Sequence, residues 1–198
     1  MADITGVLLA AGFSTRFGDN KPLHEIDGRP LIAHSVAALQ PCDRIIAVVR
    51  KDEKLQSVLD TLDIECVLNP LAERGMGSSI ACAVKASLHS SGWCLLPADM
   101  PCIDPATTQQ LVDALRDGAA LAAPSFQGQR GHPVAIGKRF AEALSALDGD
   151  TGARAIVERN IERMTLIAVD DDAVLTDIDT PADIECIRKY TDSYSAER

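Results

Sequence analysis

The sequence predicts an α/β fold, a three-layer sandwich in which a mostly parallel sheet lies between two layers of helices. Strand-like apolar segments alternate with helical segments over most of the chain, which is typical of this class. The strands are apolar almost without interruption, as at Val7, Leu8 and Leu9, and this indicates burial on both faces of the sheet. The chain has 198 residues and no recognisable repeat or linker, so we expect one domain over residues 1–198.

The expected strands are short apolar or β-branched runs that end in turn residues. The first run begins at Ile4 and leads into a glycine-containing loop, and the run that ends at Val49 is rich in β-branched residues. The strands are expected at residues 4–9, 44–49, 65–68, 92–96, 119–124, 132–136 and 165–169.

The expected helices are recognised by their apolar periodicity and by the residues at their starts. Pro30 suits the first turn of a helix, and Asp104 stands before Pro105 as a helix cap. Thr180 precedes Pro181 in the same way. The helices are expected at residues 30–39, 53–62, 77–88, 105–115, 140–147, 153–163 and 181–190.

Composition excludes several classes of protein. The formal net charge of −10 repels nucleic acid, and an aromatic content of 4% gives few platforms for stacking bases. The chain has no apolar run long enough to span a membrane and no secretion signal. The six cysteines contain no C-x-x-C pair, so we expect buried, reduced thiols in a cytoplasmic protein rather than structural zinc.

The loop after the first strand carries the strongest functional signal. Gly12 allows a tight turn that presents backbone N–H groups, and Arg16 and Lys21 follow with positive charge. The loop is neither a dinucleotide fingerprint nor a Walker loop. The two interpretations are a phosphate-binding loop, which we favour, and an ordinary turn with surface cations.

Carboxylates follow at two further places. Asp99 stands directly after the run 92–96, where it is either a Mg²⁺ ligand or a cap, and Asp104 is the better cap. Asp177 and Asp179 alternate with apolar residues, so on a strand both would point to one face. Two like charges on one face repel unless a cation or basic group neutralises them.

Two glycine-flanked turns are candidates for the acceptor side of a site. His132 lies between Gly131 and Pro133, in a segment that is either a hairpin turn or a wall of the site. Arg154 follows the segment 149–153, which either caps a helix or contributes this arginine to an acceptor phosphate.

Together these motifs resemble the MobA-like nucleotidyltransferases, in particular the molybdenum cofactor cytidylyltransferase branch. The resemblance runs from about residue 4 to 187 and implies the nucleotide-diphospho-sugar transferase (glycosyltransferase-A) type of fold. The matching segments are Leu9-Ala10-Ala11-Gly12-x-Ser14-x-Arg16-x-Gly18-x-x-Lys21, Asn69-Pro70, Gly75-Met76-Gly77-Ser78-Ser79, Ala98-Asp99-Met100-Pro101, Arg130-Gly131-His132-Pro133, Gly149-Asp150-x-Gly152-Ala153-Arg154 and Asp177-Ile178-Asp179-Thr180-Pro181.

The resemblance also implies roles for single residues. The nucleotide would contact Leu9, Ala10, Ala11, Gly12, Ser14, Arg16, Lys21, Asn69, Ser78 and Asp99. Arg16, Lys21 and Asp99 would be the catalytic residues, with Mg²⁺ on Asp99 and Asp179. His132 and Arg154 would bind the acceptor.

The implied reaction is the transfer of CMP from CTP to the terminal phosphate of a molybdopterin-type cofactor, which then reaches a molybdenum hydroxylase partner. Relatives that transfer GMP tend to carry Leu-Ala-Gly-Gly, whereas this chain carries Leu-Ala-Ala-Gly, which favours CTP over GTP. The alternatives are the same chemistry with GTP or with another phosphate acceptor, and a carrier that delivers the cofactor to a hydroxylase.

Overall fold

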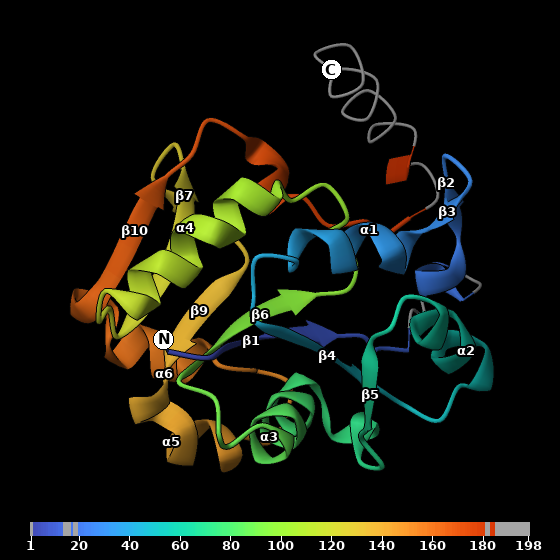
Figure 1. Ribbon diagram of the computed structural model, residues 1–198, viewed down its shortest axis with the longest axis horizontal. Helices are drawn as coiled ribbons and strands as arrows, with labels where there is room; N and C mark the ends of the chain where they lie inside the picture. The colour runs from blue at the N-terminus through green and yellow to red at the C-terminus, as the bar shows by residue number, and fades with distance from the viewer. Residues whose placement is uncertain (1, 14–16, 18–19, 181–182, 185–198) are drawn as a thin grey trace.

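The computed structural model describes residues 2–13, 17, 20–180 and 183–184. An eight-stranded sheet forms the centre, in the order β10-β7-β9-β6-β1-β4-β5, with β8 beside β7. Helices lie on both of its faces (Figure 1), so the predicted three-layer α/β architecture is confirmed. The strands are β1 (Ile4–Leu9), β4 (Arg44–Val49), β5 (Glu65–Leu68), β6 (Gly92–Pro97), β7 (Leu121–Phe126), β8 (Gln129–Arg130), β9 (Val134–Gly137) and β10 (Met164–Ala168).

The helices fall into two groups according to the hydrophobic cluster they enter. One cluster holds core residues of α1, α2 and α4, and the other holds core residues of α3, α5 and α6. Side chains alternate along each strand, so Leu8 of β1 enters the first cluster and Val7 the second. The helices are α1 (Leu31–Ala38), α2 (Glu53–Thr61), α3 (Met76–Ala86), α4 (Pro105–Arg116), α5 (Ala141–Ser145) and α6 (Arg154–Arg159).

The strand directions contain one reversal. β1 pairs in parallel with β4 and β6, and β4 pairs in parallel with β5. β9 is antiparallel to both β6 and β7. The chain reverses after β7, forms β8 alongside it, and then enters the sheet as β9 between β6 and β7. β7 and β10 are again parallel, so the sheet is mostly parallel, as predicted.

Several elements differ from the sequence-based expectation. The predicted helix 153–163 ends at Arg159 and continues as a 3₁₀ turn, Ile161–Arg163. A short hairpin of β2 (Glu25–Ile26) and β3 (Arg29–Pro30) precedes α1, and Asp27 and Gly28 at its tip have φ of 52° and 74°. An Asp-Gly pair is a strong signal for such a turn, so the sequence contains the information for this hairpin. Most of the helix predicted at 181–190 lies outside the described residues.

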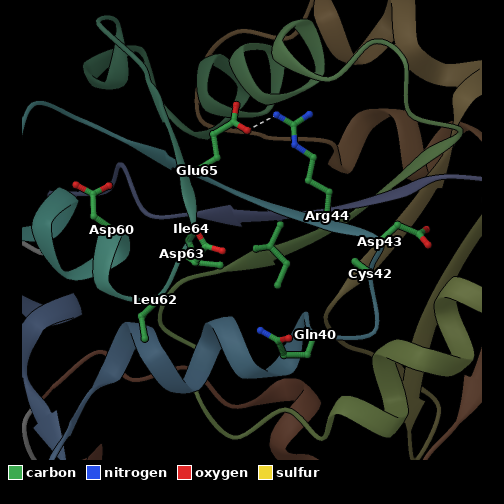
Figure 2. A pocket seen from close by; sticks show the side chains of 10 residues that line it. Gln40, Cys42, Asp43, Arg44, Asp60, Leu62, Asp63, Ile64 and Glu65 are labelled. Carbon is green, nitrogen blue, oxygen red and sulfur yellow. Dashed lines mark hydrogen bonds and ion pairs between the residues drawn. The ribbon is translucent and has the colours of Figure 1, made fainter.

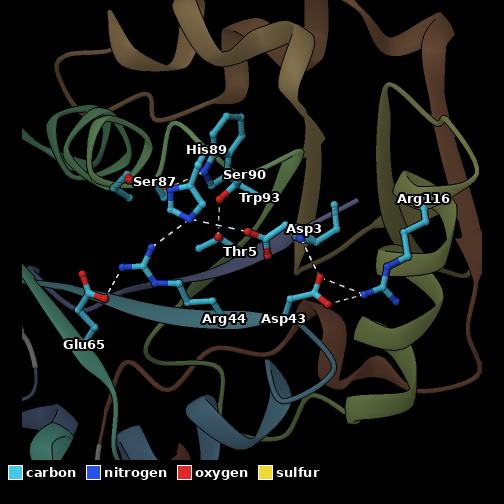
Figure 3. A network of polar contacts seen from close by, with 12 residues as sticks. Asp3, Thr5, Asp43, Arg44, Glu65, Ser87, His89, Ser90, Trp93 and Arg116 are labelled. Carbon is cyan, nitrogen blue, oxygen red and sulfur yellow. Dashed lines mark hydrogen bonds and ion pairs between the residues drawn. The ribbon is translucent and has the colours of Figure 1, made fainter. Parts of the chain in front are cut away.

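The amino ends of the strands are joined by polar contacts (Figure 3). The Asp43 carboxylate accepts a hydrogen bond from the backbone N–H of Ile4 at 2.8 Å and a second from Arg116. The Ile4 N–H is the main reason that the pKa of Asp43 lies below its ordinary value. Arg44 forms an ion pair with Glu65 and so connects the starts of β4 and β5.

An open hollow of about 700 Å³ lies at this same edge (Figure 2). Its walls come from the loop before β4 and from the turn between α2 and β5. In α/β sheets of this kind ligands bind at the opposite edge, beyond the carboxyl ends of the strands. The candidate site is therefore sought there. Within the described ranges, no helix is long and apolar enough to cross a bilayer.

Candidate functional site

The loop after β1 lies at the carboxyl edge of the sheet, as predicted. The backbone N–H of Ala10 donates to the Val48 carbonyl at 2.9 Å, and the N–H of Ala98 donates to the Leu9 carbonyl at 3.2 Å. These bonds fix the loop after β1 against the ends of its two neighbouring strands. The start of this loop and Asp99 therefore lie at one edge because the strands that precede them are parallel neighbours.

A cavity of about 370 Å³ opens beside this loop, and we call it the carboxyl-end cavity. Leu9, Ala11 and Gly12 line it, and a Cβ added at Gly12 would have no atom within 4 Å. A smaller hollow beside it is lined by Ala10 and Lys21, and Gly12 and Asp99 line both spaces. The predicted nucleotide residues at positions 9–12 thus border open space. The predicted Ser14 and Arg16 lie outside the described residues.

Three carboxylates gather at the edge of this cavity, and we call them the carboxylate cluster: Asp99, Asp177 and Asp179. One oxygen from each lies within 4.8 Å of the others. The sequence analysis expected Asp99 at a strand end and Asp179 as the second metal position. The structure brings these two residues together, although they lie about 80 positions apart in sequence. Asp177 completes the cluster, although the sequence analysis did not assign it to the metal.

The geometry that presents Asp177 and Asp179 is a loop, where the sequence analysis considered a strand. The segment follows the 3₁₀ turn Asp172–Leu175. The N–H of Ile178 donates to the Asp99 carbonyl at 2.8 Å, and Ile178 itself is fully buried. This one backbone bond places a carboxylate on each side of Ile178 next to Asp99.

Lys21 lies inside the cluster. Its Nζ is 2.9 Å from Asp99 Oδ2 and 3.4 Å from Asp179 Oδ1. Its side chain is 7% exposed, and Asp99 and Asp179 are 32% and 43% exposed. The sequence analysis expected this lysine on a triphosphate. In the structure it neutralises part of the negative charge of the cluster.

Asn69 and Ser78, both predicted to contact the nucleotide, bond to each other. Asn69 Nδ2 donates to Ser78 Oγ at 2.9 Å and to Ser79 Oγ at 3.0 Å, while Asn69 Oδ1 accepts from the Leu71 N–H. Asn69 is 4% exposed, and Ser79 is the member of this group that lines the cavity. The structure therefore shows Asn69 and Ser78 fixing the turn between β5 and α3, and a nucleotide contact for them stays a prediction.

Two glycines let a second loop close over this wall of the cavity. Gly75 has φ +98°, and a Cβ there would lie 2.0 Å from Asp150 Oδ1 and 2.7 Å from the Gly149 carbonyl. The N–H of Gly77 donates to the Gly149 carbonyl at 2.7 Å. Arg74 adds an ion pair with Asp148. These contacts explain how Asp150, from a distant loop, comes to line the carboxyl-end cavity.

His132 approaches the same carboxylates from the loop before β9. Its backbone N–H donates to the Val174 carbonyl at 2.9 Å. Its pKa is lowered mainly by burial and further by the charge of Arg130, against opposing effects of Asp99 and Asp177. Its ring atom Nδ1 is buried and has no hydrogen-bond partner among the described residues. The imidazole is therefore neutral near pH 7, and its predicted contact with an acceptor remains a prediction.

The structure does not bring Arg154 to the cluster. Its side chain is 74% exposed, and its Nε donates to Glu158 at 2.6 Å on the next turn of α6. It is also absent from the walls of both spaces beside the loop after β1.

Burial raises the pKa of the Cys102 thiol to about 12, which keeps it protonated and supports a packing role.

The sequence analysis did not identify one basic residue near the loop, Arg50. Arg50, directly after β4, places its guanidinium carbon 5.3 Å from the centre of the Phe13 ring, and Phe13 lines the cavity. Arg50 also lies 3.8 Å from Asp52, which accepts a hydrogen bond from Asn20. Its position after a parallel strand was the signal that could have identified it.

Comparisons with known proteins match the chain to one family. Residues 6–164 match the family described as "MobA-like NTP transferase domain". A "Probable molybdenum cofactor guanylyltransferase" of Natronomonas pharaonis is 28% identical, over 96% of this chain and 98% of that protein. A "Nicotine blue oxidoreductase" of Paenarthrobacter nicotinovorans is 30% identical, over 89% of this chain and 92% of that protein.

Solved structures share the fold. A nucleotidyl transferase from Methanothermobacter has a TM-score of 0.82 at 21% identity, covering 96% of this chain and 99% of that chain. A Mycobacterium tuberculosis protein in complex with manganese has a TM-score of 0.72 at 21% identity, covering 85% and 89%. At this level of identity the likeness shows the fold alone.

Proposed function

Because the chain belongs to the family of MobA-like NTP transferase domains, we propose that it transfers CMP from CTP to the terminal phosphate of a molybdopterin-type cofactor. One observation carries the proposal: the carboxylate cluster and Lys21 meet at the cavity beside the glycine-containing loop. Backbone N–H groups, a lysine and a set of carboxylates are the groups that bind and neutralise a triphosphate.

The proposed reaction is an in-line displacement at the α-phosphorus of CTP. An oxygen of the acceptor phosphate forms the new P–O bond, and the bond between the α-phosphorus and the bridging oxygen to the β-phosphate breaks. Pyrophosphate leaves with that oxygen. The acceptor phosphate is ionised at neutral pH, so the protein needs no strong general base and contributes mainly positioning and charge neutralisation.

The carboxylate cluster fits a divalent cation. Mg²⁺ binds oxygen at about 2.0–2.1 Å in octahedral geometry, which puts neighbouring ligand oxygens about 3 Å apart and opposite ones about 4 Å apart. One oxygen each of Asp99, Asp177 and Asp179 already lies within 4.8 Å of the others. These residues would hold Mg²⁺, which when bound supplies positive charge beside the α-phosphate and the leaving pyrophosphate.

The preference for CTP rests on Ala11. This residue is 4% exposed and lines the carboxyl-end cavity, so its methyl group takes up space that a glycine would leave open. A smaller pyrimidine base suits the narrower space, although one methyl group discriminates by only about 1–3 kcal/mol. From the resemblance we also propose that Ser14 and Arg16 contribute to the triphosphate site and that His132 contributes to the acceptor site.

The test is an incubation of the protein with Mg²⁺, molybdopterin and each of the four nucleoside triphosphates in turn, with pyrophosphate as the readout. We expect release with CTP that depends on the acceptor. Release with GTP would move the proposal to guanylyl transfer, and release with another phosphate acceptor would change the substrate. Tight cofactor binding with no turnover would favour a carrier. A parallel incubation with nicotine blue as the electron acceptor and NADH as the reductant covers the redox activity named for one relative, and consumption of both without pyrophosphate would refute the proposal.

A further inference from the structure

Lys21 and the proposed metal would compete for the same carboxylates. The Lys21 ammonium lies 2.9 Å from Asp99 Oδ2 and 3.4 Å from Asp179 Oδ1, so it bridges two members of the carboxylate cluster. Two cations between one pair of carboxylates repel each other. A divalent cation should therefore bind the cluster more tightly once the ammonium has moved away.

The backbone of Lys21 is fixed while its side chain can swing. Lys21 begins the 3₁₀ turn Lys21–Leu23, whose ends are tied by hydrogen bonds from Leu23 N–H to the Asn20 carbonyl and from His24 N–H to the Lys21 carbonyl. Pro22 is buried and adds rigidity. A lysine stem has four rotatable carbon–carbon bonds, so the ammonium can leave the carboxylates without any change in this turn.

 Lys21 lines the smaller hollow together with Gly12 and Asp99, and the latter two residues also line the carboxyl-end cavity. A triphosphate in that cavity would offer anionic oxygens beside the ammonium. The Lys21 ammonium would then bind phosphate oxygens in place of carboxylate oxygens. Lysine binds both kinds of oxygen as a point charge.

We propose that Lys21 is a built-in cation that holds Asp99 and Asp179 together and releases them to a divalent cation when the triphosphate binds. The identity of the incoming ligands rests on the proposed function. The exchange itself rests on the two contacts of the ammonium. It gives Lys21 a positioning role at the metal ligands in addition to the phosphate contact that the sequence predicts, and it makes the protein a weak metal binder in the absence of nucleotide.

The test is a titration of the whole chain with Mn²⁺ in the absence of nucleotide, followed by electron paramagnetic resonance of the free ion. Lys21→Met removes the competing ammonium, and we expect it to bind Mn²⁺ at least about tenfold more tightly than the unmodified protein, which corresponds to about 1.4 kcal/mol. Lys21→Gln is the second variant in case Lys21→Met does not fold. Lys21→Arg keeps the charge and should bind Mn²⁺ as weakly as the unmodified protein.

The matched control is Lys85→Met, which removes the same charge from an exposed position on α3. Equal Mn²⁺ affinity of the Lys21 and Lys85 variants would overturn the proposal, as would a gain that survives Asp99→Asn in the Lys21→Met background. The titration contains neither CTP nor acceptor. Its failure is therefore distinguishable from a failure of the proposed function, which is measured as pyrophosphate.

Discussion

Gly75→Ala should lower both the stability of the protein and the affinity of its proposed nucleotide site. Gly75 has φ +98°, a conformation that side chains rarely adopt, and this strain costs on the order of 1–3 kcal/mol. The new Cβ would also lie 2.0 Å from Asp150 Oδ1 and 2.7 Å from the Gly149 carbonyl. The Asp150 side chain can rotate away, but the Gly149 backbone is held by the N–H of Gly77 at 2.7 Å.

The collision with Gly149 should add roughly 1–3 kcal/mol to the strain, as overpacking does elsewhere. Gly118→Ala is the matched control, because Gly118 has φ +96° and a Cβ there would have no atom within 4 Å. The control therefore measures the cost of a side chain at a similar positive φ without the collision. The difference between the two variants reports the contact between the loops.

Thermal unfolding followed by circular dichroism gives this difference, and calorimetry gives the affinity for CTP. For a chain of this size 1 kcal/mol shifts the midpoint by about 2–4 °C. We expect Gly75→Ala to unfold at least that much below Gly118→Ala and to bind CTP more weakly, because residues 75 and 150 both line the cavity. Equal midpoints for the two variants would refute the reasoning about this contact.

Three further variants test other parts of the site. Asp177→Asn should weaken Mn²⁺ binding about tenfold or more, whereas the exposed control Asp170→Asn should not, and equal effects would remove Asp177 from the cluster. Asn69→Ala should lower the free energy of unfolding by about 1–3 kcal/mol, because it leaves buried partners without their hydrogen bonds, and an unchanged unfolding midpoint would contradict that structural role. For His132, the pKa in the folded protein lies below the ordinary 6.5, so the unfolded chain takes up more protons as pH falls below 6.5 and the folded state loses stability. His132→Gln should reduce this loss of stability, measured by urea unfolding between pH 7 and pH 5. An equal fall in the free energy of unfolding of both proteins would exclude His132 as its source.

Much of the carboxyl edge could be predicted because it depends on local patterns. Nearly continuous apolar runs identified β1, β4 and β6 nearly to the residue, since strands buried on both faces have little tolerance for polar side chains. The rule that ligands bind at the carboxyl ends of such strands then put Gly12 and Asp99 at one edge. The alternation of Asp177 and Asp179 with apolar residues also indicated that a cation or basic group neutralises the pair.

The sequence alone determined the class of fold, the edge that carries the candidate site and most of the residue types in it, because these follow from hydrophobic burial and strand direction. Tertiary structure decided which of those residues meet. A single backbone bond from Ile178 to Asp99 brings Asp177 into the cluster, and the ammonium of Lys21 turns to carboxylates that lie far away in sequence. Such contacts join segments whose separation along the chain leaves no periodic signal, so only the folded packing of the loops fixes them.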